Sequence, residues 1–102
     1  MAENIEKIKT KGDNLPKADK KSYALDEDPT IRLALAMRIS DEENLGIILR
    51  RAMTDKNWFI ITAITLNPAT PDGIREKLST DFQDELLKPK WKQTKQFLNS
   101  SL

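Results

Sequence analysis

The sequence predicts an all-α protein, either a compact bundle or a short solenoid of about five to six short helices. Helix-start signals recur along the chain, since acidic, Ser, Thr or Asn residues stand directly before apolar runs. The apolar residues that follow mostly recur at helical spacing, and no pair of strand-like segments is visible. The expected helices cover residues 29–39, 41–53, 57–66, 71–78, 81–88 and 89–99.

The first two helices have the clearest signals. Asp28 can cap the helix over 29–39, and Pro29 suits its first position. Ser40 and Glu43 have capping-box spacing before the helix over 41–53. That second helix has an amphipathic stripe, formed by Leu45, Ile48, Leu49, Ala52 and Met53.

Residues 58–66 are ambiguous between helix and strand. Their β-branched and aromatic residues favour a strand by propensity. The segment nevertheless lies between capped helices and has no visible partner strand, so a helix over 57–66 is expected. Because it is apolar on all sides, it should be central and buried.

Proline and cap residues divide the rest of the chain. Pro68 prevents the central helix from continuing, and Thr70-Pro71 starts the helix over 71–78. Thr80 and Gln83 have capping-box spacing at the start of the helix over 81–88. Pro89 separates this helix from the last one.

Charge divides the chain into three parts. Residues 1–22 carry six Lys and four acids, residues 23–87 seven Lys and Arg and twelve acids, and residues 88–102 four Lys and no acid. The first part is too polar to recover its ordering entropy. We therefore expect a flexible basic tail over 1–22 and a single helical domain over 23–102.

The chain contains an approximate internal repeat. Residues 31–49 overlay residues 60–78 without a gap, and apolar residues meet at five positions. The pairs are Ile31 with Ile60, Ala34 with Ala63, Leu35 with Ile64, Leu45 with Ile74, and Leu49 with Leu78.

This repeat resembles the leucine-rich repeat variant, a HEAT-like helical repeat family, over about residues 26–81. The motif Asn67-Pro68-Ala69-Thr70-Pro71 and the opening Asp26 to Ala36 carry the resemblance. The sequence departs from the pattern at residues 38–42, where a second Asn-Pro-x-x-Pro is absent. The resemblance implies a stacking helical scaffold without catalytic residues. The Cys-ligated iron–sulfur cluster of some members cannot be carried over, since this chain has no Cys.

The composition argues against an enzyme. Without His or Cys, the chain lacks an imidazole base, a thiol nucleophile and the usual zinc ligands. The acidic clusters 26–28 and 41–43 stand at helix starts, where caps explain them. The three Gly residues are isolated and form no phosphate-binding loop. We expect no catalytic residue, cofactor or metal.

Surplus apolar residues favour a protein-binding function, as an adaptor, inhibitor or assembly factor. A core this small need not bury all of them, so some can bind another protein or a second copy in a homodimer. The alternative is that they fill a compact bundle. The candidates are Leu33, Met37, Ile47, Met53, Trp58 and Phe59.

The second functional hypothesis is accessory nucleic-acid binding through the Lys-rich ends. Lys88, Lys90, Lys92 and Lys95 surround Trp91, and such a pattern can follow phosphates and stack a base. The acidic middle of the chain and the absence of a known motif weigh against it. No membrane association is expected, because the longest apolar run is short, and a cytoplasmic location is the default.

Overall fold

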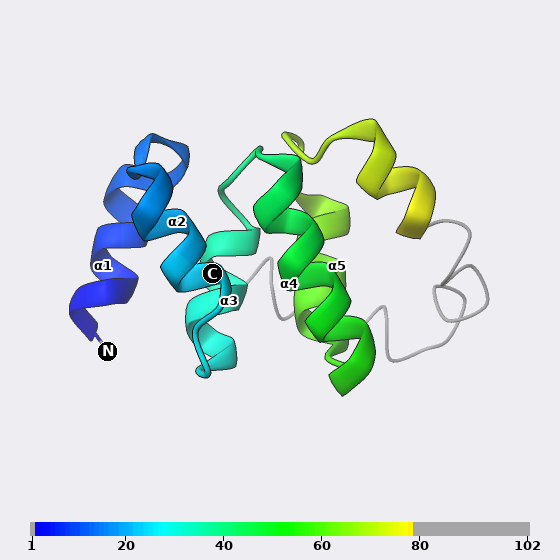
Figure 1. Ribbon diagram of the computed structural model, residues 1–102, viewed down its shortest axis with the longest axis horizontal. Helices are drawn as coiled ribbons and strands as arrows, with labels where there is room; N and C mark the ends of the chain where they lie inside the picture. Colours follow the sequence, from blue (N-terminus) through cyan, green and yellow to red (C-terminus); the bar gives the residue numbers. More distant parts are fainter. Residues whose placement is uncertain (1, 79–102) are drawn as a thin grey trace.

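The computed structural model describes residues 2–78, and this part is helical without any strand. The all-α prediction, with short helices in a compact bundle, is confirmed (Figure 1). The predicted helices over 81–88 and 89–99 lie outside the described residues. The elements are α1 (Ala2–Lys11), the 3-10 helix η1 (Gly12–Asn14), α2 (Lys17–Ala24), α3 (Pro29–Ala36), α4 (Glu42–Asp55), α5 (Trp58–Leu66) and a helical segment over 72–78.

The helices follow one another as three pairs placed side by side (Figure 1). The first members, α1, α3 and α5, lie next to one another, because α3 packs against both α1 and α5. The second members do the same: α2 packs against α4, and Gly46 of α4 faces Ile74 of the segment 72–78. The middle pair, α3 and α4, therefore has neighbours on both sides.

The packing of α5 against α3 and α4 explains why residues 58–66 form a helix despite their strand propensity. Ile60, Ile61, Ala63 and Ile64 are all buried, and Thr62 is buried with them. The free energy gained by burying such a helix is much larger than the small preference of these residues for a strand. Asn57 starts this helix, since its Oδ1 accepts a hydrogen bond from Ile60 N at 3.2 Å.

The caps of α3 and α4 agree only in part with the sequence analysis. Asp28 caps α3 and accepts from Thr30 N at 2.9 Å, and Pro29 stands at the helix start, as predicted. The predicted capping box at Ser40 is wrong, because Asp41 caps α4 and accepts from Asn44 N. Ser40 instead donates from its backbone N and its hydroxyl to Asp13.

The expectation of a flexible tail over residues 1–22 needs correction, because α1, η1 and most of α2 occupy this range. Ile8 is fully buried and Leu15 nearly so, and both belong to the main core. Lys7 bonds Asp19 at 3.0 Å and thereby ties α1 to α2. This segment is folded because it packs against α3. Its own polar composition gives no sign of that packing.

Polar side chains link the connection inside one helix pair to the connection inside the neighbouring pair. Asp13, after α1, accepts from Ser40 in the connection between α3 and α4. Asn67, after α5, is 4% exposed and donates from Nδ2 to Ala36 O at 3.0 Å and Ile39 O at 2.8 Å. Asn67 thereby provides a donor for a carbonyl oxygen that the end of α3 leaves without a partner, and for a second one just beyond it.

The apolar residues that pair in the overlay of 31–49 on 60–78 are buried in the structure. All ten residues that it pairs, from Ile31 with Ile60 to Leu49 with Leu78, are buried. The two halves thus present apolar side chains to the core at corresponding positions of α3 and α5, and of α4 and the segment 72–78.

Candidate interaction site

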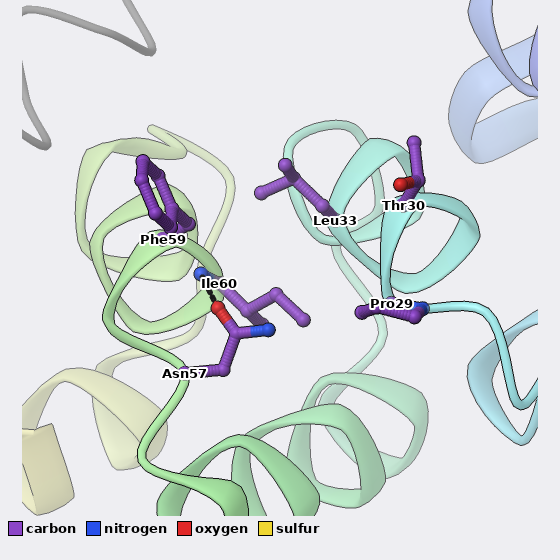
Figure 2. A pocket seen from close by; sticks show the side chains of 6 residues that line it. All are labelled: Pro29, Thr30, Leu33, Asn57, Phe59 and Ile60. Carbon is purple, nitrogen blue, oxygen red and sulfur yellow. Dashed lines mark hydrogen bonds between the residues drawn. The ribbon is translucent and has the colours of Figure 1, made fainter.

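An apolar groove lies between the N-terminal halves of α3 and α5 (Figure 2). Its volume is about 230 Å³, and its wall is almost entirely apolar. In the close view, Leu33 of α3 and Ile60 of α5 point into the gap between the two helices. The residues that line it are Pro29, Thr30, Leu33, Asn57, Phe59 and Ile60.

Local structure on both sides holds this groove in place. Pro29 begins α3 and Asn57 caps α5, so both walls start from fixed helix N-termini. Direct packing of α3 against α5 sets the spacing between the walls. On α5, Ile61 is fully buried and Ile60 is 1% exposed at the base of the groove, whereas 44% of the surface of Phe59 is exposed.

The structure separates the six predicted partner-binding residues into two groups. Leu33 and Phe59 come together in the groove. The other four do not line it. Like Leu33, they are partly buried and pack against the core, and they are Met37, Ile47, Met53 and Trp58.

Sequence reasoning missed other exposed or groove-lining residues. Leu25, which follows α2, is 57% exposed, and Leu66, at the end of α5, is 40% exposed. Pro29 and Ile60 were identified only as a helix start and a core residue, yet both line the groove. Only the packing angle between α3 and α5 decides which side chains share a groove, so no sequence signal could have found them. The predicted nucleic-acid residues Lys88, Lys90, Trp91, Lys92 and Lys95 lie outside the described residues.

Three consecutive acids, Asp26, Glu27 and Asp28, directly precede Pro29 in the sequence, and none of them is among the residues that line the groove. Asp26 Oδ1 accepts from Asp28 N at 2.8 Å, and Asp28 Oδ1 accepts from Thr30 N. Glu27 between them is exposed. The carboxylates of Asp26 and Asp28 are thus held by backbone donors at the start of α3.

The same region contains a buried arginine. Arg32 of α3 is 3% exposed, and its Nε has no hydrogen-bond partner within the described part of the chain. Burial lowers the pKa of Arg32, and the nearby Arg51 lowers it further, while Asp55, Asp26 and Glu27 act in the opposite direction. The acids of the α2–α3 connection therefore also offset a cation that the fold places in poor contact with water.

A second hollow, of about 480 Å³, lies between α2 and the start of α4. Its charged groups mostly pair with one another: Lys20 bonds Asp13 at 3.0 Å and lies 3.7 Å from Asp41, and Lys21 lies 3.8 Å from Glu43. Asn44, 6% exposed, has an Oδ1 without a donor among the described residues. Ion pairing within the wall accounts for most of this hollow's polar character.

No group of three or more Asp and Glu residues within 2–78 converges as a metal site would require. Asp41 is the cap of α4, and Glu42 and Glu43 occupy its first turn. Burial acts to raise the pKa of Asp13, but hydrogen bonds from Ser40 and Lys20 outweigh it and leave the pKa below its usual value. A carboxylate stabilised in its charged form suits a structural contact better than proton transfer.

No helix among the described residues is long and apolar enough to cross a membrane. Comparisons with protein-family models, curated proteins and solved structures find no match to this chain. The groove between α3 and α5 is therefore interpreted from its own geometry.

Proposed function

We propose that this protein is a non-catalytic protein-interaction module, an adaptor, inhibitor or assembly factor, that binds its partner through the groove between α3 and α5. The observation that carries the proposal is the exposure of Phe59 beside Leu33 on an apolar groove. A cytoplasmic location belongs to the same proposal and rests on the sequence alone.

The chemistry of the groove supports a protein partner. Exposed aromatic side chains beside an apolar pocket are typical anchors of protein interfaces, where a few residues contribute most of the binding energy. The apolar lining of the groove favours a partner segment with an apolar anchor, since apolar contact at such a site supplies most of the affinity.

The arrangement of the helices supports the same proposal. Three helix pairs side by side, with corresponding buried positions in the second and third, are compatible with the resemblance to the leucine-rich repeat variant family. Stacked helix pairs provide rigid surfaces between neighbouring helices, and proteins built in this way commonly use these surfaces to bind other proteins.

Site-specific photo-crosslinking in the native cell tests this function. A photoreactive phenylalanine analogue at position 59 should capture a defined protein that mass spectrometry identifies. The same analogue at position 50, an exposed residue of α4, is the control. Equal crosslinking at both positions would contradict the proposal.

The identified partner then permits a quantitative test with purified proteins. Phe59→Ala should weaken binding by about tenfold or more, as expected for an aromatic anchor. Leu66→Ala, which removes an exposed apolar residue of the same helix outside the groove lining, should have a much smaller effect. Circular dichroism of both variants checks that they are folded, and unchanged affinity in folded Phe59→Ala would refute the role of the groove.

A further inference from the structure

We propose that Arg32 and Arg51 form a binding site for a carboxylate, which an Asp or Glu side chain of the partner protein supplies. The carboxylate site stands on the position and contacts of these two arginines, while its assignment to a partner rests on the function proposed above. The partner would then combine an apolar anchor with an acidic residue.

Arg32 of α3 is a buried cation without a direct counter-charge. Only 3% of its surface is exposed, yet its Nε has no hydrogen-bond partner and none of the ion pairs within residues 2–78 includes it. Buried charges in proteins are normally paired, because the loss of hydration costs more free energy than the packing of the side chain returns. An acceptor from outside the described residues would supply the missing partner.

The end of this guanidinium is accessible to such an acceptor. Nε is completely shielded, whereas Nη1 and Nη2 are not and form no hydrogen bond with the described residues. A carboxylate can accept from both Nη atoms at once, and this paired geometry makes Arg a common partner of carboxylates. The free donors therefore favour a planar anion with two oxygen atoms.

Arg51 of α4 adds a second positive charge to the site. It is exposed, and it lies close enough to Arg32 that its charge lowers the pKa of Arg32. Its Nε donates to Asp55 Oδ2 at 3.4 Å, a long contact between exposed groups, and such surface pairs contribute little to stability. A carboxylate placed between the two arginines would relieve their mutual repulsion.

The acids near Arg32 do not occupy this position. Asp26, Glu27 and Asp55 act to raise the pKa of Arg32, but no ion pair joins any of them to it. Asp26 accepts from the backbone N of Asp28, and Asp55 accepts from Arg51. Glu27 is exposed, so it is the competitor within the chain that the experiment has to exclude.

The site lies beside the groove between α3 and α5 rather than within it. Pro29 lines the groove, and in α3 it is followed by Arg32 three positions later and by Leu33 four positions later. Residues at these spacings are neighbours on the surface of a helix, so Pro29 adjoins both Arg32 and the groove residue Leu33. A partner segment with an acidic residue close to its apolar anchor can therefore contact both places.

A titration of the full chain with sodium acetate tests the carboxylate site, and nuclear magnetic resonance of the arginine Nε–Hε groups is the readout. Acetate lacks the other contacts of a partner, so we expect a dissociation constant on the order of 10 mM. The signals of Arg32 and Arg51 should shift and saturate, whereas that of Arg50, an exposed residue of α4, should not.

Sodium chloride at equal ionic strength is the control for this titration, because screening of charges also changes the signals. The absence of a saturable shift with acetate, or an equal shift with chloride, would overturn the proposal. Glu27→Gln identifies the competitor: equal saturation in this variant and in the natural chain supports the proposal. Saturation in the variant alone would show that Glu27 already occupies the site, and would overturn it.

Arg32→Met separates a binding role from a structural one. Because Arg32 has no direct partner to lose, the melting temperature of the variant should stay the same or rise. Its affinity for the purified partner should fall by about tenfold or more, as expected for the loss of a desolvated charge pair. Arg50→Met removes an exposed cation of α4 and should leave the affinity nearly unchanged. A lower melting temperature of Arg32→Met, or an unchanged affinity, would overturn the proposal.

The outcomes separate this inference from the proposed function. If Phe59→Ala weakens partner binding and Arg32→Met does not, the carboxylate site fails and the proposed function stands. If acetate binds at Arg32 but crosslinking at position 59 captures no partner, the proposed function fails, and with it the assignment of the carboxylate to a partner.

Discussion

At the scale of single residues, buried polar side chains hold the connections between helices. Asn67 illustrates this, because its amide donates to two carbonyl oxygens at the end of α3 while its Oδ1 accepts from Ala69 N. From the sequence, Asn67-Pro68 was identified as the stop of a helix and as part of a family motif. The structure adds that this side chain also satisfies the end of another helix.

Asn67→Ala should lower the free energy of unfolding by about 3 kcal/mol, because two buried carbonyl groups lose their donor and unsatisfied buried groups cost ~1–3 kcal/mol each. Asn14→Ala, at an exposed position, is the control and should change stability by less than about 0.5 kcal/mol. Urea unfolding followed by circular dichroism measures both. Similar midpoints for the two variants would show that the Asn67 contacts contribute little.

Asp13 predicts a pH dependence of stability. Hydrogen bonds from Ser40 and Lys20 leave its pKa below the ordinary 3.8 in the folded protein, despite the opposing effect of burial. The stabilisation from Asp13 is therefore fully present above pH 3.8 and is lost as the pH falls through the folded-state pKa. Asp13→Asn should destabilise the protein by about 1 kcal/mol at neutral pH, and the difference from the natural chain should shrink in acid. Urea unfolding at several pH values measures it, and a difference that is constant down to pH 2 would contradict this account.

At the scale of elements, the strength of local signals decided which helices were predicted. The helices α3, α4 and α5 and the segment 72–78 have caps and apolar residues that the sequence displays directly. The helices α1 and α2 have few apolar residues, and their order depends on α3. Local sequence patterns do not predict such helices, because the helices are stabilised by contact with residues that are distant in the sequence.

Ile8→Ala tests whether α1 belongs to the core. Ile8 is fully buried, so its truncation should lower the free energy of unfolding by about 3 kcal/mol, in the usual range for large-to-small core substitutions. Lys9→Ala at the neighbouring exposed position should change it by less than about 0.5 kcal/mol. A flexible tail would instead leave the two variants equally stable in thermal or urea unfolding.

The end of α4 offers a stabilising substitution. Lys56 has a left-handed backbone with φ 55°, a conformation that costs a residue with a Cβ of the order of 1 kcal/mol and costs glycine little. Lys56→Gly should raise the free energy of unfolding by about 0.5 kcal/mol, since the greater freedom of glycine in the unfolded chain offsets part of the gain. Lys56→Ala keeps the strain and should not stabilise. An increase in melting temperature for Ala but not for Gly would contradict this explanation.

At the scale of the whole molecule, the order of the helix pairs implies uneven local stability. The middle pair has neighbours on both sides, whereas α1 packs chiefly against α3. Helices with few packing neighbours open more easily than helices packed on several sides, so α1 should open more easily than α4 and α5.

Native-state hydrogen exchange should therefore show an order among the described helices. The amides of α1 are expected to exchange with a lower opening free energy than those of α4 and α5. Nuclear magnetic resonance of the exchanging chain measures this residue by residue. A single opening free energy for all helices would indicate that the described part unfolds as one cooperative unit.

The sequence by itself determined the all-α class, the approximate positions of four helices and the ten overlaid apolar positions that face the core. These properties depend on caps, proline and helical periodicity, which act over a few neighbouring residues. Only the tertiary structure decided that residues 2–24 are ordered, that Asp41 rather than Ser40 caps α4, and that Leu33 and Phe59 share a groove while Met37 and Trp58 do not. Each of these depends on how helices distant in sequence pack together, and that packing is set by the whole core rather than by any local pattern.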